Sequence, residues 1–178
     1  MTSERRRPLV VDASVGVAIC IEEPAVDPAL SILRERDAHG GKLLVPAFFW
    51  LEVVNVLVRR YRQPPGLVVA SIVDLQNLNL ETVELDRPQL LLTIDAMGRG
   101  ALSAYDAAYL ALAESADAEL LTFDRRLAVA AGDRAIPMDG GHTIWEARES
   151  YAPSWAGWPG AAAYLKKLRA QVAGQATG

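Results

Sequence analysis

Cysteine and histidine are nearly absent from this chain of 178 residues, which contains one cysteine, Cys20, and two histidines, His39 and His142. A single cysteine excludes an internal disulfide and is typical of a protein from a reducing compartment. The same scarcity leaves too few ligands for a zinc site of Cys and His, and it disfavours catalysis by paired histidines. We therefore expect any catalytic or metal site to be built from oxygen ligands.

Long hydrophobic runs are also missing. No apolar run reaches the roughly 18 residues that a membrane span needs, and Asp12 interrupts the apolar stretch that follows the basic start of the chain. These features predict a cytoplasmic protein without a membrane span or a signal peptide. The hydrophobic content of 51% and the net charge of −4 predict one domain with a substantial core, and they argue against strong non-specific binding of nucleic acid.

Short apolar runs alternate with segments of helical periodicity along the first 139 residues. The runs that predict strands are PLVVDAS, KLLVPA, ETVEL, AELLTFD and RAIPM. Helices are expected at 29–36, 46–63, 68–78, 88–97 and 103–116, the second stopped by Pro64 and the fourth by Gly98. Strands separated by such helices predict a three-layer α/β/α fold around a mostly parallel sheet of about five strands.

The composition changes after about Asp139. Residues 140–178 begin with a segment rich in Trp, Gly and Pro that holds three of the four tryptophans, and the remainder has apolar residues at helical spacing, namely Tyr164, Leu165, Leu168 and Val172. We interpret residues 1–139 as the main domain and residues 140–178 as an extension of it with a C-terminal helix. This extension either packs as an extra helix or contacts a partner.

Two acids stand at the carboxyl ends of predicted strands. Asp12 follows LVV, and Asp124 follows LLTF much later in the chain. Ligands bind at this edge of an open parallel sheet, so the two carboxylates meet there if their strands are neighbours. Each acid also fits a helix N-cap, as does Ser14 after Asp12. The residues alone leave both interpretations open.

Two further acids are candidates for the same edge. Asp106 lies in LSAYDAAYLALAE, where Ser103 and Asp106 also match a capping box. Glu52 stands within an apolar run, where a buried charge needs a proton, a partner or a metal ion. A polar stripe on the predicted helix holds Glu52, Asn55, Arg59 and Arg62. This stripe is either a face of the helix that is exposed to solvent, or its first turns face an acidic pocket.

Four converging acids cannot all stay ionised without cations. Because the donors are oxygens alone, they favour Mg²⁺ or Mn²⁺ over zinc. Such an ion suits the attack of water on a phosphodiester. The neighbouring arginines Arg59, Arg125 and Arg126 are candidates for contacts with phosphates, and salt bridges within the protein are the open alternative.

The stretches VVDASV, WLEVVNVL, LSAYDAAYLALAE and LLTFDRRL resemble, in this order, those of PIN-domain ribonucleases, and most of all the VapC-type toxins of bacterial toxin–antitoxin pairs. The resemblance covers residues 8–139 and implies a PIN-like fold and an Mg²⁺-dependent endoribonuclease. It implies that the metal site consists of Asp12, Glu52, Asp106 and Asp124, with support from Ser14, Asn55 and Thr122. It also implies a homodimer that cleaves RNA such as tRNA or rRNA, inhibited by a VapB-type antitoxin that covers the active site.

The chain departs from the family pattern at two points. Some members carry a further acid two residues after the fourth, where this chain has Arg126, so a fifth acidic ligand is missing there. The extension after residue 139 lengthens the chain beyond a typical toxin, which bears on the toxin role more than on the nuclease role. The alternative is a catalytically silent PIN-like module that binds RNA or protein, and the presence of all four acids disfavours it. A haloacid-dehalogenase-type phosphatase is disfavoured because Ser14 stands where its second aspartate would be.

Overall fold

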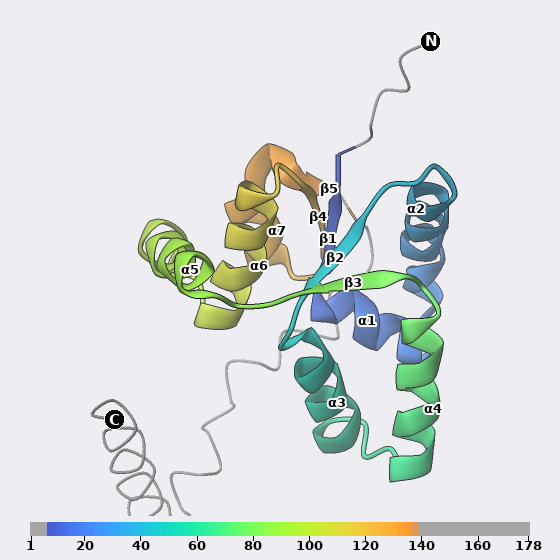
Figure 1. The fold of residues 1–178 in the computed structure, drawn as a ribbon. Coiled ribbons are helices and arrows are strands. Elements are labelled where there is room, and N and C mark those ends of the chain that lie inside the picture. Colours follow the sequence, from blue (N-terminus) through green and yellow to red (C-terminus); the bar gives the residue numbers. More distant parts are fainter. Residues whose placement is uncertain (1–6, 137, 139–178) are drawn as a thin grey trace, which may run out of the picture. The chain divides into compact units, whose positions relative to one another are not determined.

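The computed structural model describes residues 7–136 and 138, all of which belong to the first of two units of the chain, Met1–Trp145. These residues form one parallel sheet with the strand order β3, β2, β1, β4, β5 (Figure 1). The strands are β1 (Leu9–Val11), β2 (Leu43–Pro46), β3 (Leu80–Val83), β4 (Glu119–Leu121) and β5 (Ala135–Ile136). All five predicted strands are therefore present. The predicted C-terminal helix lies outside the described residues.

The helices cover both faces of the sheet. They are α1 (Ala13–Cys20), α2 (Asp27–Ala38), α3 (Phe49–Arg59), α4 (Pro65–Gln76), α5 (Arg87–Gly100), α6 (Ala104–Ser115) and α7 (Arg125–Ala131), with the short 3-10 turns η1 (Pro24–Val26) and η2 (Gly132–Arg134). Figure 1 shows α5, α6 and α7 on one side of the sheet, and α1, α2 and α4 on the other. The predicted three-layer α/β/α fold is confirmed. No helix in the described part of the chain is long and apolar enough to cross a membrane.

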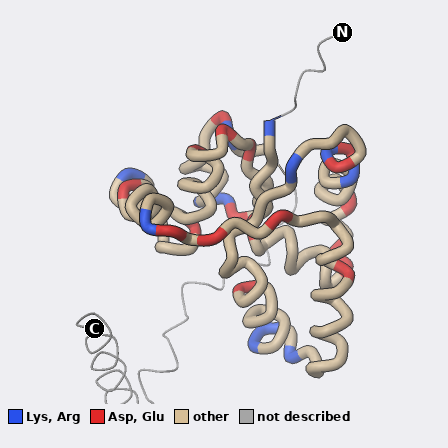
Figure 2. Tube along the Cα trace, viewed as in Figure 1, with Lys and Arg blue, Asp and Glu red and all other residues tan. Residues whose placement is uncertain are grey.

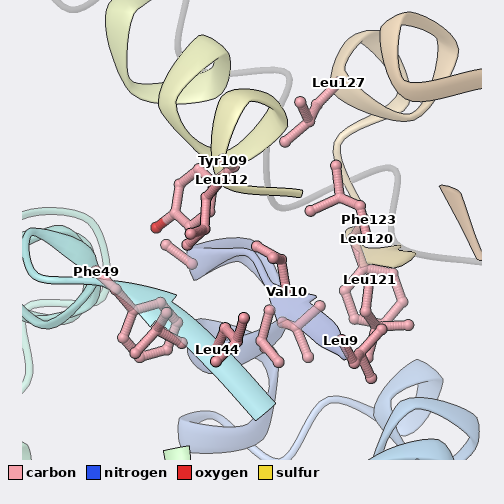
Figure 3. Close-up of a cluster of buried hydrophobic side chains, with 14 of the residues drawn as sticks. Leu9, Val10, Leu44, Phe49, Tyr109, Leu112, Leu120, Leu121, Phe123 and Leu127 are labelled. Carbon is pink, nitrogen blue, oxygen red and sulfur yellow. The ribbon is translucent and has the colours of Figure 1, made fainter. Parts of the chain in front are cut away.

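The core lies against the central strands. All three residues of β1 are buried, as expected for a strand covered on both faces. Helix α6 contacts β1, β2 and β4, and its residues from Ala107 to Ala113 are all buried. Figure 3 shows Leu9, Val10 and Tyr109 in this cluster of buried side chains. The fixed position of α6 matters for the site because Asp106 lies in its first turn.

The predicted helix at 46–63 is wrong at both ends. Pro46 is the last residue of β2, and α3 runs only from Phe49 to Arg59. Pro64 was expected to stop the helix, but Pro65 opens α4 and Pro64 caps it. Proline suits the first helical position because its φ angle is already helical and the missing N–H would have no partner there.

The predicted end of the fourth helix at Gly98 is also wrong. Helix α5 continues to Gly100 and ends at Ala101, which adopts a left-handed conformation with φ of 48°. Contacts with α6 hold this last turn, since the Arg99 guanidinium donates to the Glu114 carboxylate of α6 at 2.7 Å. Tertiary contacts here outweigh the low helix propensity of glycine.

A close approach between α1 and α3 depends on Gly16. A Cβ atom at this position would lie 2.7 Å from Cζ of Phe49 and 3.0 Å from Cγ2 of Val53. The absence of a side chain therefore allows the first turns of α3 to pack directly on α1. This packing brings Glu52, in the first turn of α3, to the same end of the sheet as Asp12 at the start of α1.

Candidate active site

Asp12 connects the central strand to the first helix. It follows β1 directly, is fully buried and is the N-cap of α1, accepting a hydrogen bond from the backbone N–H of Ser14 at 3.2 Å. The capping role that the sequence left open is therefore present. It does not exhaust the interactions of this carboxylate, because two hydroxyl groups also donate to its Oδ2 atom.

Two hydroxyl side chains link the ends of β1 and β4, which are adjacent parallel strands. The Ser14 hydroxyl donates to Asp12 Oδ2 and accepts from the backbone N–H of Phe123 at 3.0 Å. The Thr122 hydroxyl donates to the same Asp12 oxygen at 2.8 Å and accepts from the backbone N–H of Asp124 at 2.8 Å. Each hydroxyl thus acts as donor and acceptor at once, which holds the Asp12 carboxylate against the segment that carries Asp124.

Asp124 has a corresponding structural role at the end of β4. Its Oδ1 atom caps α7 by accepting from the backbone N–H groups of Arg126 at 2.8 Å and Leu127 at 3.1 Å. Its side chain is buried. Asp12 and Asp124 therefore begin two helices at the carboxyl edge of neighbouring strands, which places both acids at the position where open parallel sheets bind ligands.

Asp106 is electrostatically coupled to both of these acids. The pKa of its carboxyl is raised to about 6, first because the group is partly buried and then because the charges of Asp12 and Asp124 repel its ionised form. The hydrogen bond from the Ser103 hydroxyl, at 2.7 Å, and the charge of Arg126 act in the opposite direction. Ser103 also caps α6, since the Asp106 N–H donates to its hydroxyl at 3.2 Å, which is one half of the predicted capping box. Capping and clustering of these acids thus occur together.

Glu52 reaches the cluster through a residue that the sequence analysis did not identify. The hydroxyl of Tyr109 donates to Glu52 Oε2 at 3.0 Å, which links α6 to α3. Tyr109 is fully buried, and its pKa is raised well above its usual range, first by burial and then by the charges of Asp12 and Asp106. The signal for Tyr109 was its position three residues after Asp106, on the same face of a helix.

The other predicted site residues lie at the surface. Asn55 is exposed on α3 one turn after Glu52, and Arg59 is exposed in the last turn of that helix. Glu52 lies in the first turn of α3 and Arg59 in its last turn, so acidic and basic residues stand at opposite ends of the helix (Figure 2). Arg62 does not extend the stripe, because it lies beyond the end of α3 with φ of 51°.

Two arginines follow Asp124 in the sequence. Arg125 and Arg126 are both exposed at the start of α7. The Arg126 guanidinium donates to the backbone oxygen of Ala101 at 3.4 Å, and its charge lowers the pKa of Asp106. A cation therefore stands close to Asp106, at the position where some PIN-domain ribonucleases would place another acid.

The acids at this edge of the sheet are the candidate ligands for a metal ion. Among residues 7–136 and 138, no group of three or more His, Cys, Asp or Glu side chains is arranged to hold an ion by direct ligation. The donors at the edge of the sheet are carboxylates that repel one another, and these favour a hard divalent cation. Mg²⁺ needs only one or two carboxylates because it keeps several of its waters. The chemistry of the residues fits such an ion.

A family model described as PIN domain matches residues 9–133. This chain belongs to the PIN domain family. The solved structures similar to this PIN domain include PAE2754 from Pyrobaculum aerophilum, with a TM-score of 0.53, 23% identity, and coverage of 73% of this chain and 88% of that one. A toxin–antitoxin complex from Klebsiella pneumoniae matches with a TM-score of 0.56, 16% identity, and coverage of 72% and 96%.

VapC20 of Mycobacterium tuberculosis, described as a toxin that cleaves the sarcin–ricin loop, matches with a TM-score of 0.56, 16% identity, and coverage of 72% of this chain and 99% of that one. A search of curated proteins found no match. At these identities the solved structures establish the shared fold of the PIN domain.

Replacing Asp106 by asparagine should stabilise the PIN domain at neutral pH. The folded state raises the pKa of this carboxyl to about 6, above its value of about 4 in an unfolded chain. The native state therefore binds the proton more tightly, and ionisation of Asp106 costs stability as the pH rises from about 4 to 6. We expect Asp106→Asn to gain about 1–2 kcal/mol at pH 7.5 and nothing at pH 4.

Denaturant unfolding in EDTA at both pH values measures this difference. Asp74→Asn, which changes an exposed acid on α4, is the matched control and should unfold like the unmodified protein at each pH. A loss of stability in Asp106→Asn at pH 7.5 would mean that its capping interaction outweighs the repulsion among the acids.

Proposed function

We propose that this PIN domain is a metal-dependent endoribonuclease and the toxin component of a VapBC-type toxin–antitoxin pair. One observation carries the proposal: Asp12 and Asp124 stand at the ends of neighbouring strands, joined through the Thr122 hydroxyl, and the charges of both add to burial in raising the pKa of Asp106. Crowded carboxylates with a perturbed pKa are typical of functional sites, where a cation or a substrate uses them.

In this proposal Asp12, Asp106, Asp124 and Glu52 bind a hydrated Mg²⁺ or Mn²⁺, with one or two of the carboxylates in direct contact and the others reaching the ion through its waters. When bound, the ion would activate water and stabilise the leaving oxygen of a phosphodiester. Ser14 and Thr122 keep the Asp12 carboxylate at a fixed orientation through their hydroxyl donors. Tyr109 restrains Glu52 in the same way. These buried hydrogen bonds spare the acids from rearranging when the cation binds.

The surface around the acids offers contacts for the RNA backbone. Arg125 and Arg126 are exposed beside Asp124, and Arg59 and Asn55 are exposed further along α3. Guanidinium groups suit phosphate because they can donate two parallel hydrogen bonds. We assign the three arginines to phosphate contacts, and we assign Asn55, one turn beyond Glu52, to support of the acidic site.

The biological role rests on the structural neighbours. One is described as a toxin–antitoxin complex, and another as a toxin that cleaves the sarcin–ricin loop, which is an RNA target. By analogy with them, the substrate is a structured RNA such as tRNA or rRNA, and a VapB-type antitoxin blocks the site. A cytoplasmic homodimer is part of the same proposal.

Removal of divalent cations should stop RNA cleavage. We expect the purified protein to cut total tRNA or rRNA in Mg²⁺ or Mn²⁺, and EDTA to abolish the products on a denaturing gel because the acids then lack their cation. Re-addition of Mn²⁺ in excess of EDTA should restore cutting. Cleavage that persists in EDTA would contradict the metal mechanism, and RNA binding without cleavage under all conditions would favour the silent binding module.

A further inference from the structure

Three aromatic rings form a continuous ridge next to the acids. Phe48 stands between Tyr105 and Tyr109, with ring centroids 5.5 Å and 5.3 Å away and both pairs edge to face. Tyr105 and Tyr109 are four residues apart on α6 and so share one face of that helix. The ridge begins at the buried Tyr109 and ends at the surface with Tyr105, which is 57% exposed.

Tyr105 is unusual among the exposed apolar side chains. In the described part of the chain, the other large hydrophobic residues that are strongly exposed are all aliphatic. The Tyr105 ring is also held in place, because it packs edge to face with the ring of Phe48. An exposed aromatic ring that is already ordered can bind a flat ligand at little cost in side-chain entropy.

The position of this ring relates it to the proposed chemistry. Tyr105 directly precedes Asp106 in the first turn of α6, and Phe48 caps the helix whose first turn holds Glu52. The ring therefore lies beside the two helix starts that contribute acids. A nucleotide whose phosphate reaches the acids has its base, or the base of its neighbour, within reach of such a ring.

We propose that Tyr105, supported by Phe48, is a stacking platform for an unpaired base of the RNA next to the scissile phosphate. The proposal rests on the proposed ribonuclease function and adds a binding subsite to it. Aromatic side chains bind single-stranded RNA by stacking, and such stacks tolerate different bases because each base has a π face. The site therefore selects single-stranded or looped RNA, but stacking alone does not discriminate among base sequences.

Binding measurements on an RNA that stays intact test this proposal. In an Asp12→Asn background, a fluorescein-labelled single-stranded RNA of twelve nucleotides is titrated and followed by fluorescence anisotropy. Tyr105→Ala should weaken binding by about tenfold, whereas Tyr105→Phe, which keeps the ring, should stay within about twofold of the parent. Val129→Ala removes a 76% exposed aliphatic side chain on α7 and should have no effect. Unchanged melting temperatures confirm that each variant is folded.

A set of RNAs with one abasic nucleotide at each position identifies the stacked base. One abasic position should weaken binding to the parent by about tenfold and should not weaken binding to Tyr105→Ala any further, because the same stack is already lost. If Tyr105 only supported the fold, the loss of affinity from the abasic nucleotide would add to the loss from Tyr105→Ala. That result would overturn the proposal.

The outcome separates this inference from the proposed function. If the unmodified protein cuts RNA and Tyr105→Ala binds every RNA as tightly as its parent, the stacking site is wrong and the exposed ring belongs to a protein contact. If binding depends on Tyr105 but the unmodified protein never cuts RNA, the stacking site stands and the nuclease function is wrong.

Discussion

Replacing Asp124 by asparagine should abolish RNA cleavage without lowering the melting temperature. Loss of a supporting hydrogen bond at a metal site costs about 10- to 100-fold in activity, and loss of a carboxylate that holds the cation should exceed this, by about 10³-fold or more. Asparagine caps a helix about as well as aspartate, so the bonds to Arg126 and Leu127 can be kept. Removal of one charge also relieves the repulsion of Asp106.

Cleavage rates and thermal unfolding of the same preparation check this result. Asp133→Asn is the control, since Asp133 is an exposed acid in the turn η2 after α7. We expect it to retain full activity. An Asp124→Asn protein that unfolds well below the unmodified protein would show that this acid serves the fold first, and the loss of activity would then say nothing about a cation.

Replacing Thr122 by valine should reduce both stability and cleavage. The change preserves the shape of the side chain but removes the hydroxyl that donates to Asp12 and accepts from the Asp124 N–H. It thus leaves a buried carboxylate with one donor fewer and a buried N–H without its acceptor. We expect a loss of about 2–4 kcal/mol in the free energy of unfolding and of about 10- to 100-fold in cleavage rate.

Two variants separate the hydroxyl effect from a loss of packing. Thr122→Ser keeps the hydroxyl and should retain most of the activity, despite the lost methyl group. Thr93→Val removes another buried hydroxyl, which bonds only to the Gln89 carbonyl of its own helix at 2.8 Å, and should cost less than about 1 kcal/mol with no effect on cleavage. Equal effects of Thr122→Val and Thr93→Val would contradict a special role for the Thr122 hydroxyl.

Tyr105 and the acids occupy different parts of the same edge of the sheet. The substitutions at Asp124 and Thr122 act on the acids, whereas Tyr105→Ala leaves every acid and hydroxyl of the cluster in place. We therefore expect the first two to lower the maximal rate of cleavage. The Tyr105 substitution should act mainly on the affinity for RNA.

The periodicity of the sequence predicted most of the elements. The strand at Leu9–Val11 and the helix at Ala104–Ser115 were found because continuous apolar runs and helical spacing are local patterns. The errors lay in the helix ends that were expected at Pro64 and Gly98. Proline can begin a helix as well as end one, and the Pro64–Pro65 pair begins α4. At Gly98, tertiary packing outweighs the low helix propensity of glycine, and α5 continues to Gly100. The nature of each element was thus more predictable than its ends.

For the candidate site, the sequence supplied the acids and their places after strands, but it could not choose between a capping role and a clustering role. The structure has both: Asp12 and Asp124 cap helices and also raise the pKa of Asp106. Tyr109 was overlooked because the helical pattern around it predicts only an ordinary core residue. Its contact with Glu52, from a different helix, places its hydroxyl at the site.

The sequence by itself determined the parallel α/β architecture, the oxygen-only character of the site and the positions of the acids at element starts, because these follow from short-range patterns and residue chemistry. Only the tertiary structure decided that β1 and β4 are neighbours and that Ser14 and Thr122 share one Asp12 oxygen. These features depend on contacts between segments about a hundred residues apart, and no local pattern encodes which segments will meet.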